Sequence, residues 1–409
     1  MANALITPSV IAKVALASLD NELVMKPLVY NDYSEEFVKV GSTINVRKPV
    51  KFTVRSGSVM DVQDVQEANV AVAMDRMRGV DFAFSSTDLT LTIEELNKRY
   101  IRPAMIQLAN TIDRDLHQLY QKVWNWVGTP GTPLTTFAGF TKAPQRLMEM
   151  AVPQPYMGTL SPADQYGMLS DIKTLYVSEL AKTAIERAKL PPLAGVDTYA
   201  TQNVYTHTTG TRTNTTPVAN VTTQVTTYAL SKNTNSQTLN VTGAGTGVTY
   251  KAGDVFTLGT TTNGVLAINP VTRQALSYLQ QFVVLNDATA DGAGAVALTI
   301  SPAIIPAGDA YQTVSLVGTT TSCALTNLGT ASTGYTQNMV FAEQAFAFVS
   351  RPLVIPPGAV DAARETYKGI SARVIPVYDG INDVSKWRLD ILYGVAAPYP
   401  DLATRLSGT

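Results

Sequence analysis

Apolar residues recur along the first part of the chain with periods that predict helices separated by β-strands. Between residues 6 and 25 the apolar positions lie on one helical face, which predicts an amphipathic N-terminal arm that needs a surface to lie against. Over residues 43–54 apolar and polar positions alternate, and shorter alternating runs follow at 70–74 and 80–84. These runs predict a long hairpin or a small sheet. Because a hairpin of this length does not bury its own faces, we expect it to lie on a neighbour or to stay mobile.

The longest helical pattern runs from Thr92 to Trp126. Thr92 and Glu95 have the spacing of a capping box, in which two side chains satisfy free backbone donors of the first turn. Pro103 lacks an amide hydrogen and crowds the preceding turn, so a kink is expected there. His117 falls on the polar side of the helix, which indicates a solvated or interface residue. The apolar face comprises Ile101, Met105, Leu108, Ile112, Leu116, Leu119, Val123 and Trp126.

Between about Thr206 and Tyr335 the composition changes, and afterwards it changes back. This stretch contains no Glu, and only about eight charged residues interrupt its Thr, Gly, Ala, Asn and Val. Short apolar runs separated by turn residues predict a β-barrel or sandwich. We interpret the stretch as a β-module inserted into a host domain of mixed helix and strand. Its predicted strands are 221–228, 238–241, 255–258, 265–268, 281–285, 296–300 and 313–317, and a host helix is predicted at 178–189.

The composition favours a building block of a larger assembly. Of the 409 residues, 45% are hydrophobic and 15% are charged, a low charged fraction that is expected where partners cover much of the surface. The net charge of −1 offers no basic stripe for gripping nucleic acid. Cys323 is the single cysteine, so no internal disulfide is possible. No apolar run reaches the length of a membrane span.

Few residues offer catalytic or metal-binding chemistry. His207 lies in an extended run without ligand spacing, and Cys323 has no histidine near it in sequence, so a buried thiol is expected. Asp379 and Asp383 could form a hydrolase pair or a calcium loop, but a surface turn is the better interpretation because the calcium signature is incomplete. No Walker loop, nucleophile elbow or His-Glu-x-x-His motif occurs. We therefore expect no enzyme, no catalytic residue, no metal and no cofactor.

Six runs of sequence, taken in order, resemble segments of a known protein family. They are Ser42–Pro49, Ala68–Met74, Ser86–Trp126, Tyr250–Leu258, Phe341–Leu353 and Leu389–Pro400. Each run is weak alone, but the ordered set covers nearly the whole chain. Together they resemble the coat protein of the podovirus P-twenty-two family, whose members are major capsid proteins with the Hong Kong ninety-seven fold of tailed phages.

The resemblance implies an α+β tailed-phage capsid fold with an N-terminal arm, an extended β-hairpin loop, a long spine helix and an inserted all-β barrel. In the family the insert aids folding, and one of its loops touches a neighbouring capsomer; the matching loop here, about 231–238, carries Lys232. No autocatalytic crosslink is implied. The implied parts are 1–42 (arm), 43–85 (extended hairpin loop), 86–219 (spine helix, peripheral domain and first part of the A-domain), 220–335 (inserted barrel, or I-domain) and 336–409 (rest of the A-domain and return of the peripheral domain).

The resemblance further implies a structural major capsid protein that self-assembles into pentamers and hexamers of an icosahedral shell around viral double-stranded DNA. The implied partners are copies of the same chain, a scaffolding protein and a portal, with only weak, non-specific contact to DNA and no membrane. Assembly would take place in the host cytoplasm, and the protein would reside in the virion. The residue pattern agrees, because a closed shell needs heterologous contacts that projecting elements can make.

The alternating hairpin supplies most candidate inter-subunit contacts, because another chain completes its edges and apolar faces. An alternative stays open: a phage tail or surface-layer protein whose β-module binds a receptor or glycan. Its binding face would use aromatic residues of the insert, such as Tyr228, Tyr250, Tyr278 and Phe282. The candidate contact residues are Ile44, Val46, Arg47, Lys51, Phe52, Val54, Arg55, Asp61, Glu67 and, on the insert, Lys232.

Overall fold

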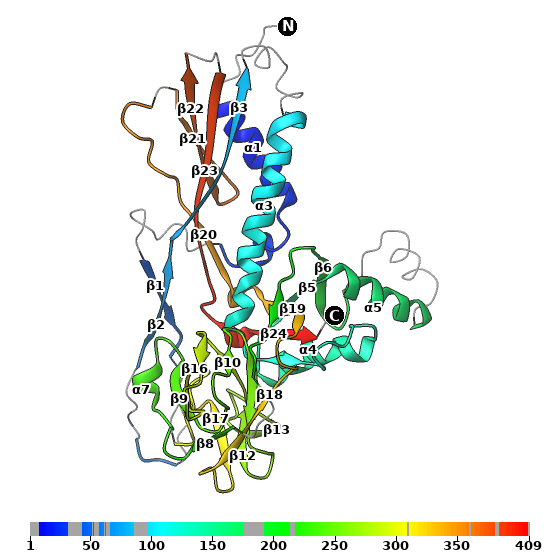
Figure 1. The fold of residues 1–409 in the computed structure, drawn as a ribbon, viewed down its shortest axis with the longest axis vertical. Helices are drawn as coiled ribbons and strands as arrows, with labels where there is room; N and C mark the ends of the chain where they lie inside the picture. Colours follow the sequence, from blue (N-terminus) through cyan, green and yellow to red (C-terminus); the bar gives the residue numbers. More distant parts are fainter. Residues whose placement is uncertain are drawn as a thin grey trace. The chain divides into compact units, whose positions relative to one another are not determined.

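The computed structural model describes residues 8–31, 43–50, 52, 57–60, 62, 66–85, 97–175, 192–212, 217–308, 311–359, 361–380 and 384–407. The chain divides into two compact units, each built from several segments (Figure 1). The first comprises Met1–Asn45, Ala71–His117 and Phe346–Pro398, and the second comprises Val46–Val70, Gln118–Ala345 and Tyr399–Thr409. Each unit is described by itself.

The first unit is built on an antiparallel sheet whose longest strand is β23. One edge of β23 pairs with β22, which in turn pairs with β21. The other edge pairs with β3 over ten residues and then with β20. The strands are β3 (Arg76–Ser85), β20 (Ala347–Ser350), β21 (Ala363–Tyr367), β22 (Ile370–Asp379) and β23 (Val384–Ala396).

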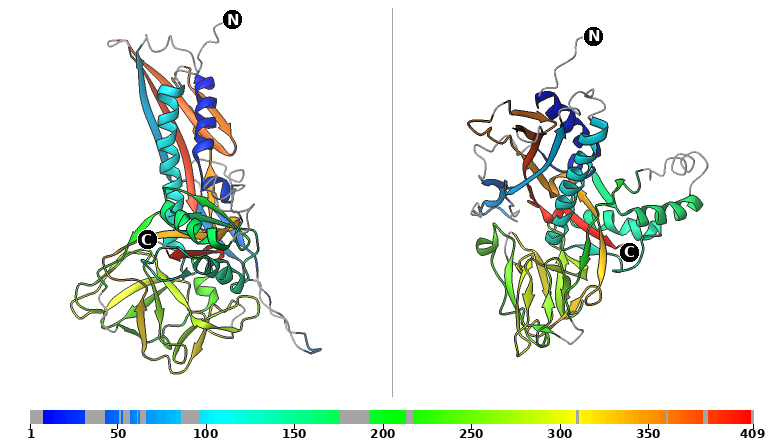
Figure 2. Two further views of the ribbon diagram at one scale, coloured as in Figure 1. Left: turned by 90° about the vertical axis from the view of Figure 1, so that its right-hand side faces the viewer. Right: turned by 45° about the horizontal axis from the view of Figure 1, so that its top comes forward.

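Two helices cover this sheet. Helix α1 contacts α3 as well as strands β21 and β22, and both views in Figure 2 place it beside them. The N-terminal helix was predicted to need a surface to lie against, and α1 finds it within its own chain, where Ile11, Ala15 and Leu19 are fully buried. The helical elements of this unit are α1 (Pro8–Glu22), the 3-10 turn η1 (Lys26–Leu28), the π-helical turn η4 (Asn97–Ile101) and α3 (Arg102–His117).

The predicted long helix is shorter than its apolar pattern. All eight residues of the predicted apolar face are buried. However, α3 ends at His117, a 3-10 turn η5 (Gln118–Lys122) follows, and Trp126 begins strand β4 (Trp126–Val127). Pro103 is the second residue of α3, directly after the π-helical turn. The first amides of an α-helix have no partner within the helix, so the missing amide hydrogen of Pro103 costs no α-helical hydrogen bond. The predicted capping box at Thr92 lies outside the described residues.

The second unit contains a six-stranded host sheet with a hydrophobic core on one face. Strand β19 is central: it pairs antiparallel with β24, β5 and, at its start, β7. Helix α4 packs on this sheet through Phe140, Ala143 and Leu147, which are fully buried. The elements are β4, α4 (Phe137–Glu149), β5 (Tyr156–Leu160), α5 (Pro162–Leu175), β6 (Val196–Ala200), β7 (Thr206–Thr208), β19 (Gly334–Ala342), η6 (Glu343–Ala345), η7 (Pro400–Leu402) and β24 (Ala403–Ser407).

The Thr-rich stretch forms a β-barrel, as predicted. Six strands hydrogen-bond in the order β8-β18-β11-β14-β16-β9. Backbone bonds of 2.9 and 3.0 Å between Val218 and Thr242 then bring the two edges of the sheet together. Figure 2 shows the strands curling around one another. Their buried apolar side chains form one core. They are β8 (Val218–Ala219), β9 (Gln237–Val241), β11 (Val255–Leu258), β14 (Gln281–Val284), β16 (Val296–Ser301) and β18 (Cys323–Asn327).

Smaller elements complete the barrel. Cys323 is buried in its core, which confirms that prediction. The predicted strand 221–228 is wrong: this segment holds turns and the start of a short helix, because its amides bond singly to distant carbonyls such as those of Thr320 and Ile304. The additional elements are α7 (Tyr228–Ser231), β10 (Thr249–Tyr250), β12 (Gly264–Ile268), β13 (Ala275–Leu279), β15 (Ala288–Thr289) and β17 (Val314–Val317).

The predicted hairpin forms with two of its three strands. Strands β1 (Thr43–Lys48) and β2 (Ala68–Ala73) make a two-stranded sheet. The third predicted strand exists as β3, but it pairs with β23. The alternating pattern therefore identified the strand without identifying its partner. The predicted helix at 178–189 lies outside the described residues.

Candidate functional site

Five of the predicted contact residues of the hairpin fall among the described residues, either on β1 or between β1 and β2. Val46 is buried, whereas Arg47 and Glu67 are exposed and face each other across the two strands, with 3.6 Å between Arg47 Nη1 and Glu67 Oε2. The backbone of Ile44 lies in β1. Phe52 is 62% exposed. Lys51, Val54, Arg55 and Asp61 lie outside the described residues.

The sequence analysis missed an apolar group at the far end of the hairpin. Val59, Met60 and Val62 are 82%, 77% and 78% exposed. We call these three residues the tip. Apolar side chains that gather on a protruding loop mark a surface that another molecule covers. Alternation could not identify them, since Val59 and Met60 are adjacent in sequence and belong to no strand.

Lys232, the candidate on the insert, lines a cavity of about 360 Å³ in the second unit. The cavity is mainly apolar. Its walls come from the base of the hairpin, the barrel and the C-terminal segment, and they include Lys48, Tyr228, Ile305, Tyr311 and Tyr399. Lys232 therefore borders a space within its own chain.

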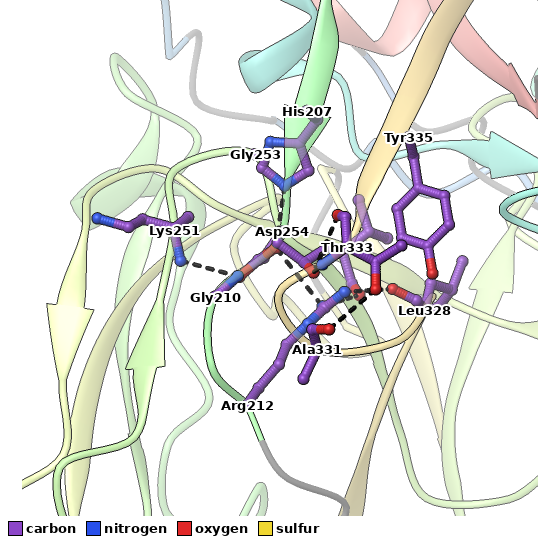
Figure 3. Close-up of polar contacts among 12 residues, drawn as sticks. His207, Gly210, Arg212, Lys251, Gly253, Asp254, Leu328, Ala331, Thr333 and Tyr335 are labelled. Carbon is purple, nitrogen blue, oxygen red and sulfur yellow. Dashed lines mark hydrogen bonds and ion pairs between the residues drawn. The ribbon is translucent and has the colours of Figure 1, made fainter. Parts of the chain in front are cut away.

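A cluster of charged side chains is buried where the barrel joins the host sheet (Figure 3). Strand β7 places His207 against Asp254, which lies in the turn before β11; His207 Nε2 and Asp254 Oδ1 are 2.9 Å apart. Arg212 approaches the same carboxylate from the other side, with Nη1 3.7 Å from Oδ1. Asp254 Oδ2 accepts hydrogen bonds from the backbone amides of Lys251 (2.8 Å) and Gly210 (3.2 Å). This carboxylate thus has both oxygens paired.

A second arginine enters the cluster from the C-terminal strand β24. Arg405 Nη1 donates to the carbonyl of Gly253 at 2.7 Å. Its guanidinium also lies over the ring of Tyr120, 5.0 Å from the centroid, and 5.8 Å from that of Trp126. Aromatic faces attract a desolvated cation and partly replace water. Arg405 thus joins β24 to the turn before β11 and to the segment that carries Tyr120 and Trp126.

The cluster holds two cations, one anion and a histidine whose protonation state depends mainly on burial. Burial lowers the pKa of His207, so its ring is neutral. The Nε2 proton is donated to Asp254, and Nδ1 accepts from the hydroxyl of Tyr120 at 2.9 Å. Burial alone would raise the pKa of Asp254, but the hydrogen bond from His207 and the charge of Arg212 outweigh it and keep the pKa low. Burial lowers the pKa of Arg405 to about 10, which still leaves it protonated at neutral pH.

Asp254, His207 and Tyr120 are hydrogen-bonded in the same sequence as the groups of an acid–base relay. Their position between the barrel and the host sheet indicates a structural role. His207, Asp254, Arg212 and Arg405 are all buried, and none of them lines the large cavity. Acid–base catalysis needs a group within reach of a bound substrate. The arrangement instead holds β7, the barrel and β24 in register.

A second buried pair lies in the first unit. Asp113 accepts hydrogen bonds from the amides of Val24 (2.8 Å) and Met25 (3.2 Å), which ties the end of the N-terminal segment to α3. One turn later His117 Nδ1 lies 2.8 Å from the carbonyl of Asp113. The prediction that His117 is solvated is wrong, because its side chain is fully buried. Burial raises the pKa of Asp113 to about 6 and lowers that of His117 to about 4.

The remaining candidates for chemistry show ordinary surface roles. Asp379 lies 3.3 Å from the ammonium of Lys386, and Asp383 lies outside the described residues. Within the described ranges, no cluster of three or more His, Cys, Asp or Glu side chains could hold a metal ion. Among those same residues, no helix combines the length and hydropathy needed to cross a membrane.

Comparison with known proteins gives a family-model match over nearly the whole chain. The family model described as P22 coat protein, gene protein 5, matches residues 3–408. A search of curated proteins gives no match. Solved structures with a similar course of the chain include one from Mycobacterium phage Che8 (11% identity, 94% of this chain and 90% of that chain, TM-score 0.47). Others are the capsid of the cyanophage P-SCSP1u (9%, 91% and 84%, 0.44) and the capsid of Ralstonia phage GP4 (8%, 90% and 83%, 0.43).

Proposed function

This chain belongs to the P22 coat protein family, and we propose that it assembles into pentamers and hexamers which close into an icosahedral shell around double-stranded DNA. Membership makes it a structural coat protein of a virion and confirms the resemblance found in the sequence. The α+β class with a β-barrel agrees with that assignment. The subdivision into capsomers and the enclosed DNA are the parts that we propose.

The exposed tip of the hairpin carries the proposal. Val59, Met60 and Val62 are among the most exposed apolar side chains of the described residues. Burying a side chain of this size stabilises an association by about 2 kcal/mol, so three of them on each of many subunits would supply a large part of the contact energy. The exposed pair Arg47–Glu67 contributes less than about 1 kcal/mol and serves mainly to select the partner surface.

The partners that we propose follow from the same surfaces. Copies of the chain cover the tip and the exposed hairpin residues Phe52, Arg47 and Glu67. A scaffolding protein and a portal would guide closure in the host cytoplasm. Contact with packaged DNA would be weak, because a net charge of −1 leaves little excess positive charge for phosphates. We propose no covalent crosslink between subunits and no enzymatic activity.

The alternative of a glycan- or receptor-binding β-module is not favoured. A glycan platform needs exposed aromatic faces. Tyr250 and Phe282 are instead buried in the barrel core. The guanidinium of Arg146 lies 3.6 Å from the ring centroid of Tyr278, and Tyr228 stacks on Tyr311 at 3.6 Å. All four candidate rings therefore already have partners within the chain.

Expression with and without a scaffolding partner tests this function. The products would be separated by sedimentation and viewed by negative-stain microscopy. We expect uniform closed shells with the scaffolding partner, and irregular particles or free subunits without it. Stable monomers or trimers that bind cells under both conditions would overturn the assignment in favour of the adhesive module.

A further inference from the structure

Side chains of the inserted barrel and of the C-terminal segment hold the base of the hairpin. The amide of Asn69 in β2 donates to Asn233 Oδ1 at 3.1 Å, and the hydroxyl of Tyr311 donates to the carbonyl of Gln66 at 3.2 Å. On the β1 side, the hydroxyl of Tyr399 donates to the carbonyl of Arg47 at 3.3 Å. Both hairpin strands are thus held through backbone groups.

Tyr311 and the loop that carries Asn233 have further contacts within the barrel. Tyr311 stacks on Tyr228 of α7 with a ring separation of 3.6 Å and an interplanar angle of 2°. The loop from α7 to β9 is anchored at Asn235, whose amide bonds to the carbonyl of Ser231 at 2.7 Å and whose carbonyl accepts from Ser301 Oγ at 2.9 Å. A contact made by anchored groups transmits the position of one element to another.

The hairpin base does not pack tightly against the barrel. Lys48 and Pro49 of the hairpin form part of the wall of the 360 Å³ cavity, opposite Ile305 and Tyr311. A close-packed core would leave no space of this size. The buried hairpin residues Val46 and Ala68 show that apolar burial and polar contacts together position the hairpin base.

We propose that Asn233 and Tyr311 of the barrel, with Tyr399 of the C-terminal segment, form an intramolecular latch that fixes the direction in which the hairpin leaves the subunit. The loop at 231–238, expected to touch a neighbouring capsomer, is here engaged with its own chain through Asn233. Each hydrogen bond is weak enough to open during a rearrangement. The consequence for shell shape depends on the proposed function; the latch itself does not.

Hydrogen exchange on the unassembled subunit tests the latch. Tyr311→Phe removes one hydroxyl and keeps the ring that stacks on Tyr228. If the contacts act as one latch, this change speeds exchange of the Asn69 amide, which Tyr311 does not touch, by about fivefold, the factor that corresponds to losing one hydrogen bond. Amides of β14 in the barrel core should keep their wild-type protection, which shows that the variant is folded.

Tyr166→Phe is the matched control, because it removes the same hydroxyl from an exposed tyrosine of α5. It should leave the Asn69 amide unchanged. Asn233→Ala should speed the same amide directly. If Tyr311→Phe leaves exchange at Asn69 at the wild-type rate while Asn233→Ala speeds it, the contacts are independent and the latch is refuted.

Assembly of the double variant N233A/Y311F then tests the consequence for the shell. We expect shells of mixed size, because the hairpin direction is no longer fixed. Uniform wild-type shells, together with accelerated exchange, would show that the barrel does not control shell geometry. If no variant and no wild-type chain assembles, the proposed function fails, and the exchange result on the latch stands by itself.

Discussion

His207 Nε2 lies 2.9 Å from Asp254 Oδ1 at a point that is closed to water, where the inserted barrel meets the strand that leads into it. The histidine comes from the host side of the junction and the aspartate from the barrel. Arg212 shares the aspartate, so an insert with few charges places one of its carboxylates where two host segments meet. This contact fixes the barrel to the host sheet.

Replacing Asp254 should strongly destabilise the second unit. Asp254→Asn removes the negative charge and leaves Arg212 buried with no counter-ion, a change that typically costs about 3–5 kcal/mol. Asp287→Asn is the control, because Asp287 and its partner Lys251 lie at the surface, where an ion pair adds little to stability. Urea denaturation followed by circular dichroism measures both. Equal losses for the two variants would contradict the assigned role of the cluster.

A methyl group at Gly210 should also disrupt this junction. A Cβ added there would lie 2.1 Å from the backbone carbonyl oxygen of Thr249, closer than any real contact. We expect Gly210→Ala to lower the unfolding free energy by more than about 2 kcal/mol, because backbone must shift to relieve the overlap. Gly292→Ala, with no atom within 4 Å of its added Cβ, should change it by less than about 0.5 kcal/mol. Thermal melts of both variants check this, and a neutral Gly210→Ala would show that the two segments separate easily.

The sequence predicted elements better than it predicted their partners. The composition change at Thr206 and the short apolar runs correctly indicated the barrel, because turn residues and strand length are local properties. The pairing of β3 with β23, three hundred residues away, has no local signature. The end of α3 at His117 was missed for a related reason: buried residues continue at helical spacing into η5 and β4, so the pattern did not mark the change of structure.

The buried cluster could not be predicted from spacing. His207, Asp254 and Arg405 are separated by tens to hundreds of residues, and each stands alone in its own segment. The low charge of the insert was the available signal, since a carboxylate kept in such a stretch needs a buried partner. The apolar tip was likewise hidden, because exposure depends on what the rest of the chain leaves uncovered.

The pair Asp113 and His117 predicts an unusual pH response of the first unit. Asp113 has its pKa raised from 3.8 to about 6, so the folded chain holds this proton more tightly and the carboxyl adds stability as pH falls from 6 to 4. His117 has its pKa lowered from 6.5 to about 4, so the unfolded chain holds this proton more tightly. Its contribution therefore lowers the free energy of unfolding as pH falls over the same interval. The two contributions oppose each other.

Single substitutions should separate them. Relative to wild type, Asp113→Asn should gain about 3 kcal/mol in unfolding free energy as pH rises from 4 to 6, because the cost of ionising the buried carboxyl is gone. His117→Gln should show the opposite slope and gain a similar amount as pH falls from 6.5 to 4. Chemical denaturation at several pH values measures both, and parallel curves for the two variants would rule out this explanation.

Polar substitution of the tip should separate folding from assembly. In the triple variant with Val59, Met60 and Val62 changed to Ser, we expect the unfolding free energy to stay within about 0.5 kcal/mol of wild type, because these side chains are exposed. The subunit concentration needed for assembly should rise at least about tenfold. Val271→Ser, at an exposed apolar position on the barrel, serves as the control and should assemble normally. Light scattering during assembly gives the threshold.

The central claim is that the exposed apolar tip is completed by another copy of the chain. A cryo-electron microscopy reconstruction of shells formed by the wild-type protein tests it most directly. The account predicts a closed icosahedral shell in which Val59, Met60 and Val62 lie against a neighbouring subunit and are buried. A shell in which these three side chains face solvent on every subunit would contradict it.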